Sequence, residues 1–342
     1  MLTAIKKSIR VQNYYNNFTE YNNTKRGNYA VNGLTYDVFQ KKTCALSFGT
    51  SQSKEGVSSN NILNCKNVSF ENKLQNVSAI YKKFIEETPF SDLPKIYVYL
   101  NEKTPPNLKD NTCVGMSDLL KGELEKAGYK NNYFLRGANS THFCLASEID
   151  GQFILLDSQM LLEHPINLTQ IKNSANKQKT LNLYPVFTQI DGSKALGTFT
   201  VKFIDENIFE AGMKNPGIGL SRTLSYDLNK KIKEKPGILY QKEVAFDKNH
   251  KSFTLRVFDE ETKDTVHLVY PHAKYFESKI ADKNNLYIRT SERKKYNYGS
   301  KEFEKYLNFI SQKLKLSVEE ITDYVINGVK LHYQHAPKDF RF

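Results

Sequence analysis

The pair Asp150-Gly151 constrains this chain more than any other sequence feature, because it separates two short segments rich in apolar side chains. An Asp-Gly step in that setting favours a two-residue β-turn, so residues 142–149 and 152–156 are predicted to form an antiparallel hairpin. A further strand is predicted just before the hairpin, at residues 132–135. Such a hairpin places the start of its first strand beside the end of its second.

A helix is predicted directly before these strands. Met116, Leu120 and Leu124 recur at helical spacing, and a glycine follows as a suitable helix stop. The predicted helix covers residues 114–127, with Cys113 at its N-terminal edge. Together with the strands it predicts an α+β fold in which a helix packs on an antiparallel sheet.

The chain around this unit is predicted to divide into four parts. Residues 1–75 are rich in Asn, Ser and Thr and are expected to form a loosely structured N-terminal extension with two short strands. The helix and hairpin belong to a core of residues 76–165, which is followed by a β-rich domain at 166–284 and a C-terminal subdomain of one strand and two helices at 285–342. Outside the helix and hairpin, strands are predicted at 36–39, 44–48, 95–100, 183–189, 198–204, 240–246, 252–258, 265–270 and 285–290, and helices at 77–86, 301–314 and 318–326.

The net charge of +12 raises the possibility of a nucleic-acid or membrane partner. The basic excess is shared evenly between residues 1–190 and 191–342, whereas a nucleic-acid binder concentrates such charge in one arm or stripe. No run of eighteen apolar residues is present, so no membrane span is expected. The first thirty residues lack the apolar region of a secretory signal. We therefore expect a cytoplasmic protein, or an effector exported without a conventional signal peptide, with no specific nucleic-acid partner.

The four cysteines form no Cys-x-x-Cys pair and lie in no Cys/His cluster with zinc-site spacing, so no metal site is expected. Cys113 stands out because backbone N–H groups and the helix dipole favour a thiolate at a helix N-terminus. Cys144, two residues beyond His142, is expected to pack in the core rather than to line a pocket.

His142 and Asp157 are the residues that the predicted hairpin brings together, since one opens its first strand and the other follows its second. If the preceding helix packs on this sheet, Cys113 reaches the other nitrogen of the imidazole. Cys113, His142 and Asp157 would then be nucleophile, general base and orienting carboxylate of a thiol enzyme. The backbone N–H of Cys113 is the candidate donor to an oxyanion.

Three short blocks in residues 110–160 resemble the transglutaminase-like cysteine superfamily, whose core is papain-like. They are Cys113-Val-Gly-Met-Ser-Asp-Leu-Leu, Thr-His142-Phe and Ile-Asp-Gly-Gln-Phe-Ile-Leu-Leu-Asp157. The resemblance implies the same Cys-His-Asp triad on a helix and two adjacent strands. It also implies acyl transfer or hydrolysis on an amide substrate through a thioester, as in a peptidase or amidase, a deamidase or a transglutaminase. The partner would be a protein or peptide substrate, or a small amine, with no cofactor.

A fainter similarity links the C-terminal part to arylamine N-acetyltransferases, which share the Cys-His-Asp core and a β-rich middle domain. It rests on Asn285-Leu-Tyr-Ile-Arg-Thr, Lys301-Glu-Phe-Glu-Lys-Tyr-Leu and Leu314-Lys-Leu-Ser-Val-Glu-Glu-Ile. This alternative implies an acyl-CoA co-substrate. The chain departs from that family before the cysteine, where Lys109-Asp110-Asn111-Thr112 stands in place of an Arg-Gly-Gly stretch. A second alternative is a binding module that keeps the fold without catalysis.

Overall fold

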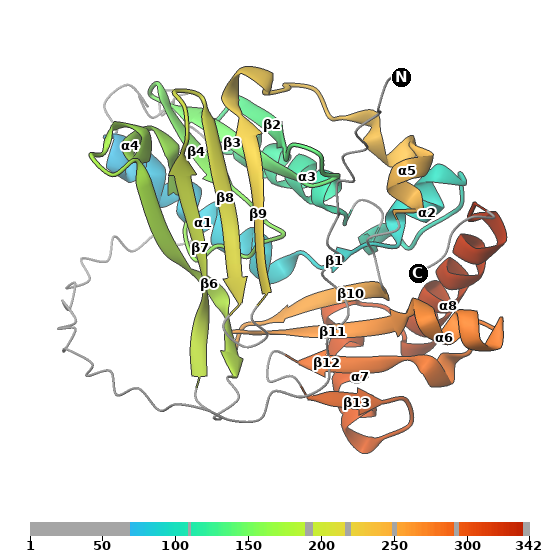
Figure 1. Cartoon of the computed structure of the whole chain (residues 1–342). Helices are drawn as coiled ribbons and strands as arrows, with labels where there is room; N and C mark the ends of the chain where they lie inside the picture. The colour runs from blue at the N-terminus through green and yellow to red at the C-terminus, as the bar shows by residue number, and fades with distance from the viewer. Residues whose placement is uncertain are drawn as a thin grey trace, which may run out of the picture. The chain divides into compact units, whose positions relative to one another are not determined.

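The structure is a computed structural model that describes residues 69–108, 111–188, 194–215, 220–247, 252–290 and 294–337. All of these ranges lie in one compact unit, Leu63–Phe342. Within them the fold is α+β, as predicted, with three antiparallel sheets and a helical C-terminal part (Figure 1). The strands predicted at 36–39 and 44–48, together with Cys44 and Cys65, lie outside the described residues, and so does most of the predicted extension.

The first sheet has the order β2-β3-β4-β5 and contains the predicted hairpin. Its strands are β2 (Asn132–Arg136), β3 (Phe143–Ile149), β4 (Gln152–Leu156) and β5 (Ile166–Asn167). Ile149 pairs with Gln152 across the turn, where Asp150 and Gly151 both have positive φ, as a tight hairpin of this kind requires. The Asp-Gly prediction is therefore confirmed in type and in register.

Two helices pack on this sheet: α3 (Cys113–Lys126) and α1 (Phe70–Glu87). Helix α3 begins one residue before the predicted start, and its apolar stripe, including Leu120 and Leu124, is fully buried. Helix α1 begins seven residues before the predicted start because the Ser69 hydroxyl caps it, accepting a hydrogen bond from the Asn72 backbone N–H at 3.3 Å.

The second sheet follows the first along the chain, after the short helix α4 (Leu168–Asn173), and has the order β6-β7-β8-β9. Its strands are β6 (Gln178–Thr188), β7 (Lys194–Phe203), β8 (Ile208–Asn215) and β9 (Leu220–Asp227). Sequence analysis placed strands over parts of β6 and β7 but found neither β8 nor β9. Phe209 and Ala211 of β8 join Val201 of β7 in the core that the first two sheets share.

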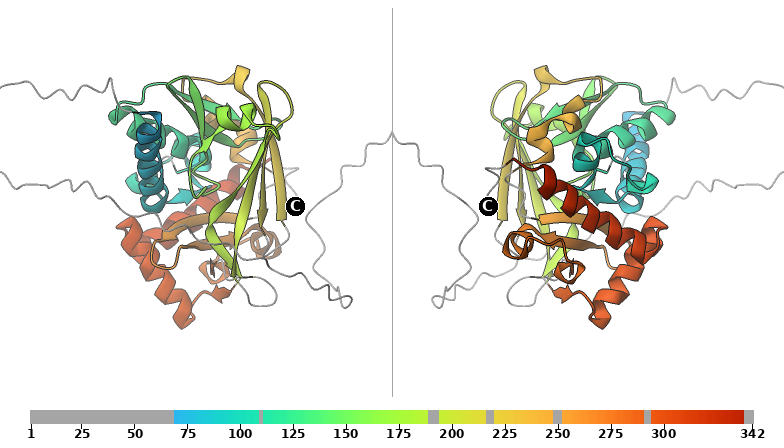
Figure 2. Two further views of the ribbon diagram at one scale, coloured as in Figure 1. Left: turned by 90° about the vertical axis from the view of Figure 1, so that its left-hand side faces the viewer. Right: turned by 90° about the vertical axis from the view of Figure 1, so that its right-hand side faces the viewer.

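The third sheet has the order β1-β10-β11-β12-β13. Its strands are β1 (Phe90–Ser91), β10 (Ser252–Asp259), β11 (Asp264–Pro271), β12 (Tyr287–Thr290) and β13 (Lys295–Asn297), and its helices are α2 (Pro94–Tyr99), α6 (His272–Ser278), α7 (Lys301–Leu314) and α8 (Val318–His335). Strand β12 pairs with β11 across the domain boundary predicted after residue 284. Figure 2 shows α7 and α8 in red, together on one side of this sheet, where Phe303 and Val325 enter a second core. The prediction of C-terminal helices is confirmed, and α8 is nine residues longer than predicted.

Two predicted strands are wrong. Residues 95–100 were expected to be a strand, but Pro94 begins helix α2, whose buried Ile96 and Tyr97 face the C-terminal helices. The Tyr97 hydroxyl donates a 2.6 Å hydrogen bond to the Tyr324 carbonyl of α8. Residues 240–246 were also expected to be a strand. The chain there forms the 3₁₀ turn η4 (Gly237–Tyr240) and the short helix α5 (Lys242–Ala245), which pack on α2.

The remaining elements are the 3₁₀ turns η2 (Pro106–Leu108), η3 (Leu228–Lys230) and η5 (Lys283–Asn285). Among the described residues, no helix combines the length and the apolar character that spanning a membrane needs.

Candidate active site

Cys113 is the first residue of α3, and the capping of this helix sets its position. The hydroxyl of Thr112, the residue before it, accepts a hydrogen bond from the Gly115 backbone N–H at 3.2 Å. The side chain of Cys113 is half-buried, and its Sγ lies 3.5 Å from the Thr141 carbonyl oxygen, to which it donates. The thiol is thus held at the positive end of the helix dipole, beside the residue that precedes His142.

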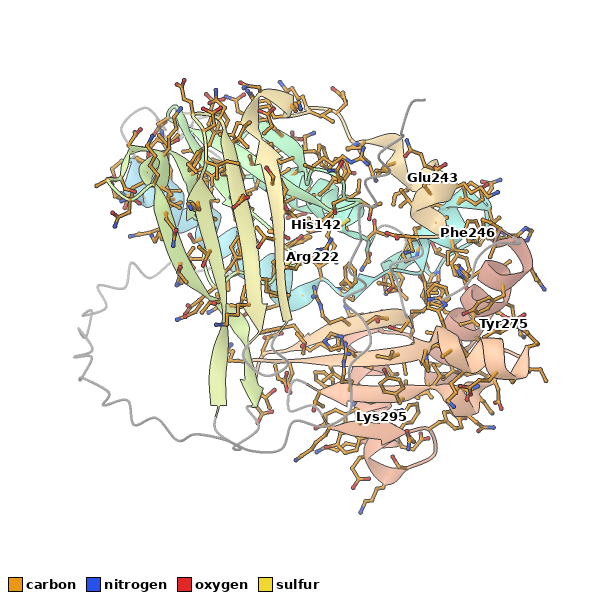
Figure 3. All side chains as sticks on the ribbon, viewed as in Figure 1. His142, Arg222, Glu243, Phe246, Tyr275 and Lys295 are labelled. Carbon is orange, nitrogen blue, oxygen red and sulfur yellow. The ribbon has the colours of Figure 1, made fainter. Side chains whose placement is uncertain are left out.

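His142 lies immediately before β3 and is 3% exposed. Its backbone N–H donates to the Ser140 hydroxyl at 3.0 Å, and this hydroxyl also accepts from Arg222 of β9 at 3.3 Å. Figure 3 labels His142 and Arg222 on these neighbouring elements. The second sheet therefore helps to fix the turn that carries the imidazole.

Asp157 follows the last residue of β4 and is 1% exposed. Its Oδ2 lies 2.7 Å from His142 Nε2, and its Oδ1 accepts from the backbone N–H groups of Gln159 and Met160 at 3.2 and 3.1 Å. The backbone carbonyl of Asp157 also accepts from the Tyr81 hydroxyl of α1 at 2.8 Å. The carboxylate is therefore fixed by both its oxygens and by its backbone.

The hairpin register explains why these two residues meet. Leu145 pairs with Leu156, so the next position sets Asp157 opposite Cys144, two residues from His142 on the same face. The structure thus brings together the three residues that the sequence singled out. Cys144 packs in the core as predicted, 1% exposed, and burial raises the pKa of its thiol well above the usual value.

The electrostatics favour a charged imidazole and a charged thiolate. Burial lowers the pKa of His142, but the charge and hydrogen bond of Asp157, with a contribution from Cys113, outweigh it and raise the pKa to about 10. Burial raises the pKa of Cys113, and the His142 imidazolium and the Phe143 backbone N–H outweigh it, so that the pKa lies below its usual value. Both shifts act in the direction of a thiolate–imidazolium pair.

The Cys113 thiol and the His142 ring do not form a hydrogen bond of standard geometry. Since Asp157 occupies Nε2, the nitrogen left for the thiol is Nδ1, which is buried and has no hydrogen bond of standard geometry among the described residues. The ring and the thiol nevertheless interact closely enough to shift each other's pKa. Such contacts are commonly long in an empty active site and tighten when substrate binds.

Cys113 packs against an apolar cluster. Its members are buried side chains from α3, the first sheet and the segment before β10: Val114, Phe134, Phe143, Ile238 and Val244. Figure 3 labels Glu243 of helix α5 in that segment and Phe246 directly after the helix. Asp247, just after α5, accepts a hydrogen bond from the Thr141 hydroxyl at 3.4 Å. The segment between β9 and β10 therefore contributes apolar side chains to the cluster beside Cys113 and a carboxylate that bonds to Thr141.

Sequence reasoning missed several charged groups near the triad: Asp92, Lys95, Asp247 and Arg256. Lys95 is 5% exposed and interacts electrostatically with Cys113, while Arg256 does so with Asp157. A signal for Lys95 exists in the sequence, because it is the one charge beside an apolar run. Because that run was predicted to be a strand, the burial of Lys95 on a helix was not expected. Among the described residues, no group of three or more His, Cys, Asp or Glu side chains is arranged to hold a metal ion.

Comparison with known proteins adds no relative to this picture. No model of a known protein family matches the chain. A search of curated proteins also gives no match. The resemblance to transglutaminase-like proteins rests on the short sequence blocks around Cys113, His142 and Asp157.

Proposed function

We propose that this protein is a thiol enzyme with a transglutaminase-like, papain-like core, in which Cys113 forms a thioester with the acyl group of an amide substrate. One observation carries the proposal. A thiol at a helix N-terminus lies beside a buried imidazole, whose far nitrogen is held at 2.7 Å by a buried carboxylate. This is the arrangement of nucleophile, base and orienting group that activates a weak nucleophile.

In the first half of the reaction, the Cys113 thiolate attacks the carbonyl carbon of the amide. The C–N bond breaks, and His142 gives its proton to the leaving amine, so that a thioester and a neutral imidazole remain. In the second half, His142 takes a proton from water or from an acceptor amine. That nucleophile attacks the thioester, and Cys113 leaves as the thiolate. The result is hydrolysis, deamidation or cross-linking, according to substrate and acceptor.

Asp157 and the start of α3 support these steps. The carboxylate keeps the imidazole in the tautomer that presents Nδ1 to the thiol, and it stabilises the imidazolium. The backbone N–H of Cys113, at the positive end of the helix dipole, is the donor that we assign to the developing oxyanion.

The test uses an activated ester as a general acyl donor. Wild-type protein mixed with p-nitrophenyl acetate should release a burst of about one equivalent of p-nitrophenolate per chain. Peptide mass spectrometry should place one acetyl group on Cys113. Cys113→Ala should show neither the burst nor the adduct, whereas Cys144→Ala should show both. Acetylation spread over several residues without a burst would contradict the proposal.

A second candidate is an acyl-CoA-dependent acyltransferase of the arylamine N-acetyltransferase type. The observation that favours it is the four-stranded antiparallel sheet β6-β7-β8-β9, which directly follows the candidate triad as a β-rich middle domain would. Incubation with acetyl-CoA, followed by mass spectrometry, separates the two candidates. Acetylation of Cys113 by acetyl-CoA would favour the acyltransferase. Reaction of Cys113 with a glutamine-containing peptide in the presence of a free amine, and not with acetyl-CoA, would favour the amide branch.

A further inference from the structure

Lys95 is a buried lysine that interacts electrostatically with the candidate nucleophile. It lies at the start of α2, and 5% of its surface is exposed. Burying an ammonium group is costly unless carboxylates compensate its charge. Lys95 interacts electrostatically with Asp92, with Asp247 and with the ionised form of Cys113.

The segment that carries Lys95 is fixed to the start of α3. The Ser91 backbone N–H donates to the Asn111 carbonyl at 2.9 Å, and the Asn111 side-chain amide donates to the Pro89 carbonyl at 2.6 Å. Asn111 lies two residues before Cys113. These two bonds therefore couple the position of α2 to that of the thiol.

The two carboxylates around Lys95 are fixed as well. Asp92 exchanges hydrogen bonds with Thr254 of β10: its Oδ1 accepts from the Thr254 N–H at 2.8 Å, and its own N–H donates to the Thr254 carbonyl at 3.2 Å. Asp247 accepts from the hydroxyl of Thr141, whose carbonyl oxygen lies 3.5 Å from Cys113 Sγ and accepts from it when the thiol is protonated. Helix α5, which precedes Asp247, packs on α2 through the edge-on rings of Tyr99 and Phe246.

We infer that Lys95 is a positioning residue for the Cys113 thiolate, a second positive charge that the protein holds beside the sulfur in addition to the His142 imidazolium. The inference deepens the proposed function and rests on it. The charged groups that interact with Cys113 are His142 and Asp157, together with Lys95, which itself interacts with Asp92 and Asp247. The first pair supplies the base, and the second group steadies the thiolate before substrate binds.

The charges of Lys95 and Asp92 are opposite, so removing one or the other should shift the pKa of Cys113 in different directions. Burial lowers the pKa of Lys95, while Asp92, Asp247 and Cys113 raise it. Burial raises the pKa of Asp92 to about 6, and Lys95 acts against that rise. Removing the ammonium should destabilise the thiolate, whereas neutralising Asp92 should stabilise it or leave it unchanged. A purely structural role of the ion pair would instead make both changes act in the same direction.

The experiment measures the pH midpoint of Cys113 alkylation by iodoacetamide, with each cysteine followed by peptide mass spectrometry. Lys95→Met and the double variant Lys95→Met/Asp92→Asn should raise the midpoint by about one to three pH units. Asp92→Asn alone should not raise it, and Lys95→Arg should restore part of the loss. The matched control is Lys126→Met in the last turn of α3, where the lysine is exposed and pairs with Glu123, and its midpoint should equal that of the wild type. Circular dichroism verifies the fold, and the double variant avoids leaving Asp92 unpaired.

The outcomes separate this inference from the proposed function through a His142→Gln variant. If His142→Gln raises the midpoint and the folded Lys95 variants do not, the inference is wrong and the proposed function stands. If the wild-type midpoint already equals that of a free thiol and no acetyl adduct forms on Cys113, the proposed function is wrong, and the inference falls with it. A rise with Asp92→Asn equal to that with Lys95→Met would also overturn the inference.

Discussion

His142 shows how burial and charge compete at a single residue. Its ring is almost fully buried, which by itself favours the neutral form. The carboxylate of Asp157 is buried with it at 2.7 Å, so the neutral ring would leave a desolvated anion without its counter-ion. The imidazolium is therefore the stable form at neutral pH, and it pulls the neighbouring thiol towards the thiolate.

This ion pair predicts how stability changes with pH. The folded pKa of His142, about 10, lies above its ordinary value, so the stabilisation is complete below about pH 6.5 and is lost as the pH rises towards 10. The free energy of unfolding of the wild type should therefore fall over this range, relative to Asp157→Asn. Urea unfolding of both proteins between pH 6 and 10 tests this. A gap that stays constant would show that His142 is not held charged by Asp157.

Asp157→Asn should also abolish most of the proposed activity while leaving the fold intact. An amide retains the size of the carboxylate but favours the wrong tautomer of the imidazole, which in related triads costs roughly four decades in rate. The matched control is Asp150→Asn, at the exposed hairpin turn, where the carboxylate accepts from the Lys73 ammonium. Turnover of p-nitrophenyl acetate measures the rate. Full activity of Asp157→Asn would require another residue to orient His142.

Among the helices and strands, those set by local interactions were predicted correctly from local sequence signals. The hairpin at Asp150-Gly151 and helix α3 follow from turn chemistry and a regular apolar stripe, and both formed within one or two residues of the prediction. Strand β8 was missed although Phe209 and Ala211 alternate towards the core, because Ala and Gly are poor strand formers. Its neighbours in the sheet, and not its own propensity, make it a strand.

Tertiary contacts explain why the strand predicted at residues 95–100 is wrong. Residues 95–100 alternate in a way that suits a strand, but tertiary contacts with α8 decide in favour of a helix.

The candidate site was predictable only in part. His142 and Asp157 were predictable because one hairpin carries both. Asp247 and Arg256 approach the triad from other elements, and no local pattern of the sequence reports that approach. The charge of Lys95 beside an apolar run is visible in the sequence, but its partners are not.

The cap of α3 offers a test at this scale. Thr112→Ala removes the acceptor for the Gly115 N–H and should cost about 1 kcal/mol of unfolding free energy. Because the cap also sets the first turn, which holds Cys113, alkylation of this thiol at neutral pH should slow down. Thr112→Ser keeps the hydroxyl and should retain both properties. Chemical unfolding measures the first property and iodoacetamide kinetics the second. An unchanged alkylation rate of Cys113 in Thr112→Ala would show that the cap does not affect the reactivity of the thiol.

At the scale of the whole described unit, Arg256 joins the third sheet to the triad. It lies on β10, and its guanidinium donates to the Gln159 carbonyl at 2.9 Å, in the loop where Asp157 is anchored. The guanidinium also lies over the ring of Phe90, 5.0 Å from the ring centroid. Burial lowers the pKa of Arg256 to about 10, and the charge of Asp157 acts against this decrease.

Arg256→Met should therefore disturb the triad from a distance. The change leaves the Gln159 carbonyl without its donor, which should cost about 1 to 3 kcal/mol of unfolding free energy. It also removes a positive charge near Asp157, so the proposed activity should fall although no group of the triad is altered. Arg289→Met, on β12 of the same sheet, is the matched control, since its side chain is exposed and should have little effect on activity. Equal effects of the two variants on activity would contradict the assigned link.

The central claim is that Cys113 is held as a thiolate by the charges around it. The most direct measurement is the pH dependence of iodoacetamide alkylation, followed separately at Cys113 and at buried Cys144. The midpoint for Cys113 should lie clearly below the ordinary thiol value of about 8.5, and Cys144 should stay unreactive over the same range. A Cys113 midpoint at or above the ordinary thiol value would contradict the account.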